Sequence, residues 1–142
     1  RGATSIWETW KESDNIYSNS HPMFGVVTEW YYRWLGGIRP HPDFPGFKEF
    51  FINPYIPNGL NYVRTKYLSP HGKIISNWKK SDNSITYDFE IPKETVAHVS
   101  IQMKKNQSIS VYKSGLNLVD IDDFQDGKFI LDNGIYTVEV SN

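Results

Sequence analysis

Glu29 is the single acidic residue in the aromatic segment 21–40, and its surroundings could support chemistry on a sugar. On a helix, with 100° per residue, Glu29 projects roughly 130° away from the apolar stripe of the segment. Gly25 lies one turn earlier on the same side and leaves space above the carboxylate. A carboxylate that is held on a rigid helix among aromatic rings is common in sites that cleave sugars.

The same glutamate also fits an ordinary role on a helix surface. Glu29 and Arg33 stand at positions i and i+4 in the favourable order, so they could form a surface ion pair. Most helical glutamates are solvated, which favours this role in a helix of unknown context. From these two residues alone, both interpretations stay open.

The element that must position Glu29 is a helix with marked ends. Pro22 suits a first helical turn, because its missing N–H costs nothing there, and Gly36-Gly37 is a natural stop. Between these ends, apolar residues at helical spacing form one stripe, which we expect to face a core. The stripe consists of Met23, Val27, Trp30 and Trp34.

Apolar residues recur about every 3.6 residues before the proline-rich stretch 39–46 and every second residue after it. Short alternating runs follow at 62–69, 73–79, 85–91, 96–103, 108–112, 128–131 and 135–140. Ser69-Pro70-His71-Gly72 suits a β-turn, and Asp126-Gly127 and Asn133-Gly134 are hairpin signals. The pattern predicts a mainly β fold, an antiparallel β-sandwich at 47–142, with 39–46 as a linker and a helical part at 1–38.

Composition excludes several classes of function. The net charge of −1 over 142 residues gives no electrostatic case for a nucleic acid or an anionic membrane, so we expect neither as a partner. His41, His71 and His98 lack metal-ligand spacing, and no phosphate-binding glycine loop occurs, so we expect no metal and no cofactor. His98 fits a packed or edge residue of a strand. The chain begins with Arg1, and we expect it to be the C-terminal piece of a longer protein.

A set of short motifs in the first half of the chain is more specific than any one of them. They are GATSIWETW at 2–10, SHPMFG at 20–25, EWYY at 29–32, GIRP at 37–40, PGFK at 45–48 and YLSPHG at 67–72. In their order and spacing, the first four motifs resemble the last barrel segment of bacterial α-L-rhamnosidases, glycoside hydrolase family 78. The resemblance continues through the motifs at 45–48 and 67–72.

The resemblance implies an (α/α)6 barrel followed by a C-terminal β-sandwich, of which the segment 1–38 would be the end of the barrel. Enzymes of this family remove terminal α-L-rhamnose from glycosides and polysaccharides with inversion. Inversion uses two carboxyl groups roughly 6.5–9.5 Å apart, one as general acid and one as general base. The family's acid lies upstream of this segment, and the base lies in the E-W-F/Y-Y string, where this chain has Glu29.

The resemblance also suggests residues that bind the sugar, together with a partner. Trp7 and Glu8 match the family's W-E near the mouth of the barrel, where a ring stacks on the sugar and a carboxylate accepts its hydroxyls. Trp7 could equally pack the helix entry, and His21 could bind substrate or only cap or pack the helix. Glu49 stands where the family often has a histidine, so it could alter substrate preference. The implied partners are a rhamnose-containing glycoside and the upstream barrel, without which the chain alone would be inactive.

Two other classes of function remain open. The chain could be a carbohydrate-binding sandwich with exposed aromatic platforms, for which Tyr62, Tyr67 and Trp78 are candidates, although core packing fits each of them better. It could also be a structural β-domain that only supports a barrel. Sugar binding by the chain alone would favour the first of these two.

Overall fold

Three short helical segments succeed one another from Pro22 to Leu35 in the computed structural model, which describes residues 4–8, 20–114, 117–118 and 126–142. The 3-10 turn η1 (Pro22–Gly25) leads into α1 (Val26–Trp30), and η2 (Tyr31–Leu35) is a wider π-helical turn. Gly37 has a φ of +70°, a conformation that favours glycine and ends the helix. The predicted ends of the helix are therefore confirmed, while its winding changes along its length.

The apolar stripe of this helix is exposed. The chain divides into two units, residues 1–31 and residues 32–142, so the stripe belongs to both. Met23, Val27, Trp30 and Trp34 are 64, 58, 45 and 50% exposed, and none of the described residues buries them. The described residues of this chain therefore form no core over the stripe, as expected for one barrel helix without the rest of its barrel. Periodicity identifies an apolar face, but it does not say whether the covering partner lies in the same segment.

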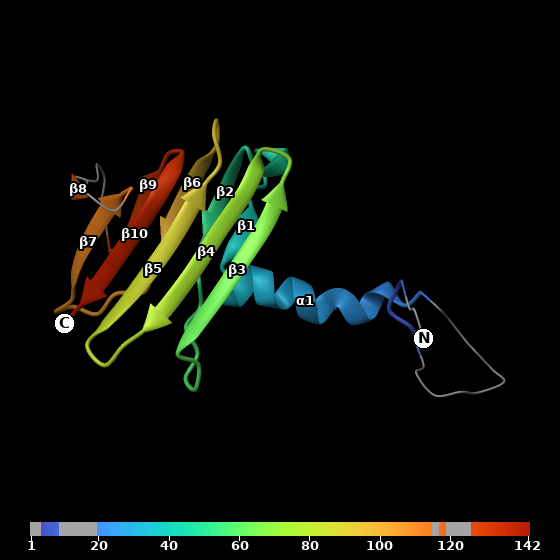
Figure 1. Ribbon diagram of the computed structural model, residues 1–142, viewed down its shortest axis with the longest axis horizontal. Helices are drawn as coiled ribbons and strands as arrows, with labels where there is room; N and C mark the ends of the chain where they lie inside the picture. Colours follow the sequence, from blue (N-terminus) through green and yellow to red (C-terminus); the bar gives the residue numbers. More distant parts are fainter. Residues whose placement is uncertain (1–3, 9–19, 115–116, 119–125) are drawn as a thin grey trace. The chain divides into compact units, whose positions relative to one another are not determined.

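The second unit contains two β-sheets, with the six-stranded sheet in front of the four-stranded one in Figure 1. The four-stranded sheet has the order β1 (Ile38–Pro40), β2 (Glu49–Ile52), β6 (Val96–Ser100) and β9 (Lys128–Leu131). The six-stranded sheet has the order β3 (Tyr62–Ser69), β4 (Gly72–Lys80), β5 (Ser84–Ile91), β10 (Gly134–Ser141), β7 (Ser108–Lys113) and β8 (Asn117–Leu118). The predicted mainly β sandwich is confirmed.

The pairing of the strands differs in two details from the expectation. β2 and β6 run parallel, because the chain passes through three strands of the other sheet before it returns beside β2. The Asn133-Gly134 hairpin prediction was wrong, since β9 and β10 lie in different sheets. Asp126 and Gly127 have positive φ values of 49° and 80°, and among the described residues β9 pairs with β6. Residues 119–125, directly before this turn, lie outside the described part of the chain, so the hairpin expected at Asp126-Gly127 stays a prediction. These dipeptides indicate the local backbone conformation and not the pairing.

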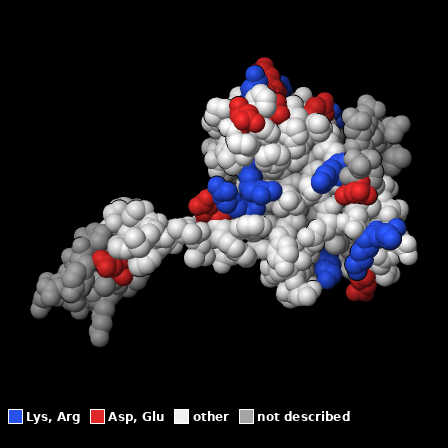
Figure 2. Space-filling view, turned by 180° about the vertical axis from the view of Figure 1, so that it is seen from behind, with Lys and Arg blue, Asp and Glu red and all other residues white. Residues whose placement is uncertain are grey.

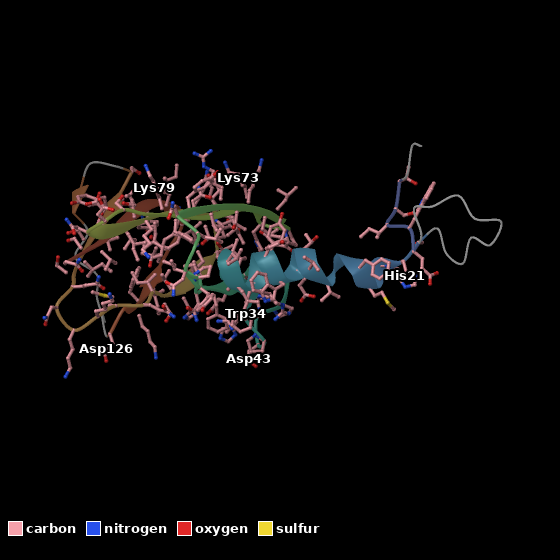
Figure 3. All side chains as sticks on the ribbon, turned by 90° about the horizontal axis from the view of Figure 1, so that it is seen from below. His21, Trp34, Asp43, Lys73, Lys79 and Asp126 are labelled. Atoms are coloured by element: carbon pink, nitrogen blue, oxygen red, sulfur yellow. The ribbon has the colours of Figure 1, made fainter. Side chains whose placement is uncertain are left out.

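The core lies between the two sheets and follows the alternation of the strands. On β5, Tyr87, Phe89 and Ile91 are buried, and Phe50 and Ile52 of β2 in the other sheet are fully buried in the same core. Burying one such side chain stabilises the fold by about 1.5–3 kcal/mol. Lys73 and Lys79 of β4 point away from this core (Figure 3).

The outer surface and the predicted linker complete the second unit. On the face seen in Figure 2, basic and acidic side chains are interspersed, without a large patch of one sign among the described residues. The predicted linker 39–46 contributes the edge strand β1 and the start of the short turn η3 (Pro45–Phe47). The division of the chain into barrel end, linker and sandwich at 38/39 and 46/47 stays a prediction.

Candidate functional site

Glu29 lies in α1, and its side chain is exposed. The space that was expected beside Gly25 has one near neighbour, because a Cβ added there would lie 3.7 Å from Cδ1 of Ile6, an ordinary van der Waals contact. The glycine therefore leaves room for about one methyl group before Ile6 is reached. Whether Glu29 acts in catalysis or only pairs with Arg33 stays open from this geometry.

Glu8 and His21 lie close together in the first unit. His21 Nδ1 is 3.8 Å from Oε2 of Glu8, and the backbone N–H of His21 donates to the carbonyl oxygen of Ile6 at 2.6 Å. The imidazole ring also contacts Phe24, with 4.6 Å between the ring centroids. Both polar side chains are partly exposed, so they remain accessible to a ligand. Ile6 and Glu8 of the first motif thus lie beside His21 of the second motif at the start of the helix.

His21 occupies the N-cap position of η1 but makes no side-chain capping hydrogen bond. The capping alternative was therefore wrong, and the contact with Phe24 supports the packing alternative. Trp7 is half-buried. An indole that is half-buried has one part in contact with protein and another part open to a ligand, so packing and sugar stacking both stay possible for it.

Glu49 lies in the second unit, at the start of β2, and pairs with a histidine of the neighbouring strand. Its Oε2 is 2.7 Å from Nε2 of His98 on β6. The ring of His98 also lies near His41 and Phe51, at centroid distances of 5.5 and 5.6 Å. His98 is therefore a packed residue, as expected. The sequence did not predict its pairing with Glu49, because nothing in the alternation indicates which strands are neighbours.

The aromatic platform candidates differ in their burial. Trp78 is 2% exposed and Tyr67 packs partly buried against the core, so core packing is confirmed for both. Tyr62 is 64% exposed, so core packing was wrong for this residue. It borders a groove of about 260 Å³ on the outer face of the six-stranded sheet, together with Arg64, Asn77, Lys79 and Asp88.

Three titratable groups form a cluster where the chain crosses from β9 to β10. Asp132 accepts hydrogen bonds from Lys113 Nζ at 2.7 Å and from the hydroxyl of Tyr136. The hydrogen bond from Lys113 lowers the pKa of Asp132, and the same bond raises the pKa of Lys113. Burial raises the pKa of Tyr136. The cluster lies on the sandwich itself and ties the crossover to β7.

The described part of the chain contains no cluster of metal ligands. No three His, Cys, Asp or Glu side chains within it are placed to hold a metal ion. None of the helices in that part is long and apolar enough to cross a membrane.

Comparison with known proteins gives one consistent family. The family model of the bacterial alpha-L-rhamnosidase C-terminal domain matches residues 37–115. An alpha-L-rhamnosidase of Formosa agariphila is 27% identical over 105 residues, which cover 74% of this chain and 11% of that protein. One of Streptomyces avermitilis is 26% identical over 109 residues, covering 71% of this chain and 10% of that protein. The chain thus spans only about a tenth of the length of these relatives.

Solved structures show the same fold. The structure of an alpha-L-rhamnosidase from Dictyoglumus thermophilum superposes with a TM-score of 0.72 and 23% identity, covering 99% of this chain and 16% of that one. The Streptomyces avermitilis alpha-L-rhamnosidase, in complex with L-rhamnose, gives a TM-score of 0.71 with 22% identity and covers 99% of this chain and 14% of that one.

Proposed function

Since this chain belongs to the bacterial alpha-L-rhamnosidase C-terminal domain family, we propose that it is the C-terminal part of an enzyme that hydrolyses terminal α-L-rhamnose from glycosides or polysaccharides. The observation that carries this proposal is the match of the family model over residues 37–115, directly after the helix that ends at Leu35. The partner of this segment would be an upstream catalytic barrel in the same protein.

Within that enzyme, Glu29 is the general base of an inverting reaction. An inverting hydrolase needs one carboxylate to take a proton from the attacking water and a second carboxyl group to protonate the leaving oxygen. The exposure of Glu29 and the small neighbour Gly25 support the first role, because both leave room for a water and a sugar. The second carboxyl group would come from the upstream barrel.

Four further residues would bind the substrate. Trp7 would stack on the apolar face of the sugar, and Glu8 with His21 would bind its hydroxyl groups, a role that their partial exposure supports. Glu49 would modulate substrate preference. The pairing of Glu49 with His98 indicates that Glu49 also stabilises the contact between β2 and β6.

The test of the base assignment is Glu29→Gln in the full-length enzyme, because this change keeps the shape and removes the basicity. We expect turnover to fall by about 10² or more while substrate binding is kept. Azide should restore turnover and yield the inverted glycosyl azide, since a small anion fits the place of the water. Glu139→Gln, a matched change at an exposed position of β10, is the control.

If Glu29 only pairs with Arg33, the same variant loses at most about 0.5 kcal/mol of stability and keeps normal turnover. That outcome would contradict the base assignment. Measuring turnover and thermal unfolding on the one variant separates the two roles.

A second candidate function is carbohydrate binding by the sandwich itself, and the exposure of Tyr62 favours it. The guanidinium of Arg64 lies over its ring, 6.0 Å from the ring centroid, at the rim of the groove on the outer sheet face. Titration of the isolated chain with L-rhamnose and with rhamnose oligosaccharides tests this function. Binding that Tyr62→Ala abolishes would support it.

A further inference from the structure

A cavity of about 730 Å³ opens at one end of the sandwich, the end at which the β4–β5 turn and the C-terminus lie (Figure 1). Two connections that cross from the four-stranded to the six-stranded sheet, residues 53–61 and 101–107, supply much of its wall. Sites for small molecules have volumes of roughly 300–1,000 Å³, so the cavity has the size of a ligand site. It shares no lining residue with the groove beside Tyr62.

The floor of the cavity is aliphatic. Ile56, Ile85 and Met103 are partly buried against the core, and Ile101 is fully buried within it. No aromatic ring from the described part of the chain lines the cavity. Burial of apolar surface drives binding to such a floor, and without a flat ring to stack on, the floor fits a methyl group better than a planar ligand.

The rim above this floor is polar and carries no net charge. Its charged residues are two lysines, Lys80 and Lys104, and two aspartates, Asp82 and Asp126. Each amide side chain offers both donors and an acceptor, as a sugar hydroxyl also does. A rim rich in amides and balanced in charge therefore suits a neutral ligand with several hydroxyl groups. The amide residues of the rim are Asn58, Asn83, Gln102, Gln107 and Asn142.

Hydrogen bonds connect the segments that form this rim. The Gln107 amide oxygen accepts from the backbone N–H of Lys104 at 2.9 Å, and its amide nitrogen donates to Oδ1 of Asn142 at 2.9 Å. The backbone N–H of Asn142 donates in turn to the carbonyl oxygen of Asn83, at 3.2 Å. The β6–β7 connection, the C-terminus and the β4–β5 turn are thus joined, which lowers the cost of ordering them around a ligand.

We propose that this cavity binds a 6-deoxysugar unit, namely an L-rhamnose residue of a glycan. The methyl group at C6 would lie on the aliphatic floor, and the hydroxyl groups would exchange hydrogen bonds with the amides of the rim. The choice of L-rhamnose rests on the proposed function, whereas the fit to a neutral sugar with a methyl group rests on the lining alone. The site involves only residues of the sandwich and requires no role for Glu29.

The experiment compares L-rhamnose with L-mannose, which differs only by a hydroxyl group on C6, in NMR titrations of the 142-residue chain. We expect a dissociation constant on the order of 1 mM for L-rhamnose, because so small a ligand makes few contacts. L-mannose should bind about tenfold more weakly, since its extra hydroxyl would lie on an apolar floor. Equal affinity for the two sugars, or no saturable binding up to about 50 mM, would overturn the inference.

Variants of the rim locate the binding site. Asn58 and Gln102 are exposed, and neither side chain has a hydrogen-bond partner in the described part of the chain, so their amides are available to a ligand. Asn58→Ala with Gln102→Ala should weaken L-rhamnose binding about tenfold. The matched control is Asn61→Ala with Asn106→Ala, because these exposed residues lie in the same two connections but do not line the cavity. The control pair should leave the affinity unchanged.

The remaining outcomes separate this site from the other proposals. Binding that Tyr62→Ala abolishes, or that the Asn58 and Gln102 variant leaves unchanged, would place the sugar elsewhere and overturn the inference. If the full-length enzyme cleaves rhamnosides and loses turnover in Glu29→Gln while the chain alone binds no L-rhamnose, the proposed function stands and this site fails. If the chain binds L-rhamnose at the rim but the full-length enzyme cleaves no rhamnoside, the site stands and the proposed function fails.

Discussion

Nε2 of His98 lies 2.7 Å from Oε2 of Glu49 across two strands that run parallel. Both side chains are partly exposed, on the outer face of the four-stranded sheet. The ring of His41 packs on Phe51 beside them, at 4.9 Å between centroids. Glu49 is therefore oriented by the sandwich itself, which gives this residue a structural role that competes with a direct contact to sugar.

We expect Glu49 and His98 to be energetically coupled. A double-mutant cycle of Glu49→Ala and His98→Ala, measured by chemical denaturation, should give a coupling of about 0.2–1 kcal/mol, as is usual for a partly exposed cross-strand pair. In the full-length enzyme, a purely structural Glu49 leaves KM unchanged in the single variant. A changed KM without measurable coupling would assign Glu49 to the substrate instead.

The sequence predicted individual strands well, because each strand carries its own alternation. The runs at 62–69 and 128–131 coincide with β3 and β9. It could not predict which strands are neighbours, since alternation gives the buried face of a strand and not its partner. The parallel pair β2–β6 and the separation of β9 from β10 into two sheets both depend on such long-range pairing.

The candidate site was predictable to the extent that it is local. The helix that carries Glu29 is marked by Pro22 and the glycines at its end, and the pair Glu8–His21 joins two motifs of the same resemblance. The hydrogen bond from Trp78 to Leu35 joins residues 43 positions apart, and no local pattern indicates it. The exposure of the apolar stripe agrees with the expectation that 1–38 is the end of a barrel, because one barrel helix without the others leaves its apolar face uncovered.

Gly37→Ala should destabilise the sandwich strongly. Gly37 has a φ of +70°, and an added Cβ would lie 2.2 Å from backbone atoms of Asn53 and Pro54. We expect a loss of about 2 kcal/mol or more in the free energy of unfolding, from both the strained φ and the clash. Gly46→Ala is the control, because its φ is +78° but nothing lies within 4 Å of the added Cβ. If denaturant titrations show the same loss of unfolding free energy for both variants, the clash with residues 53–54 does not contribute to the destabilisation.

The cluster of Asp132, Lys113 and Tyr136 should make stability depend on pH at both extremes. The pKa of Asp132 is lowered by the hydrogen bond from Lys113, so the folded state binds fewer protons there than the unfolded state. This contribution is complete above the ordinary value of 3.8 and is lost as the pH falls through the lower folded value. The pKa of Lys113 is raised above 10.5, so its contribution is present below that value and is lost as the pH rises through the folded one.

Thermal unfolding across the acidic and alkaline ranges checks this dependence. Asp132→Asn should reduce the dependence of the melting temperature on pH in both the acidic and the alkaline range, because it removes the carboxylate that titrates and that accepts the hydrogen bond from Lys113. Asp88→Asn, on the outer face of β5, controls for the loss of one negative charge. An Asp132→Asn profile parallel to that of the unmodified chain would contradict the role of the cluster.

The chain purified alone should self-associate through the exposed stripe of the helix. Val27 and Trp34 are 58 and 50% exposed, and exposed apolar patches of this kind drive association. Sedimentation velocity should show a concentration-dependent species that Val27→Gln together with Trp34→Gln removes. Leu68→Gln is the matched control, because Leu68 is 76% exposed on β3 and does not belong to the stripe. A monomer at all concentrations would show that the stripe does not drive association in solution.

The 142-residue chain alone should not hydrolyse rhamnosides. An inverting reaction needs an acid and a base on opposite sides of the scissile bond, and this chain would supply only the base, Glu29. Without the acid, the leaving oxygen departs unprotonated, and even an activated aryl leaving group would lack the barrel that holds the sugar in place. Release of aryl alcohol from an aryl α-L-rhamnoside should therefore match the buffer blank. Turnover above the blank that disappears in the Glu29→Gln chain would show that the segment contains a complete site, whereas turnover that persists in that variant would reveal a contaminating enzyme.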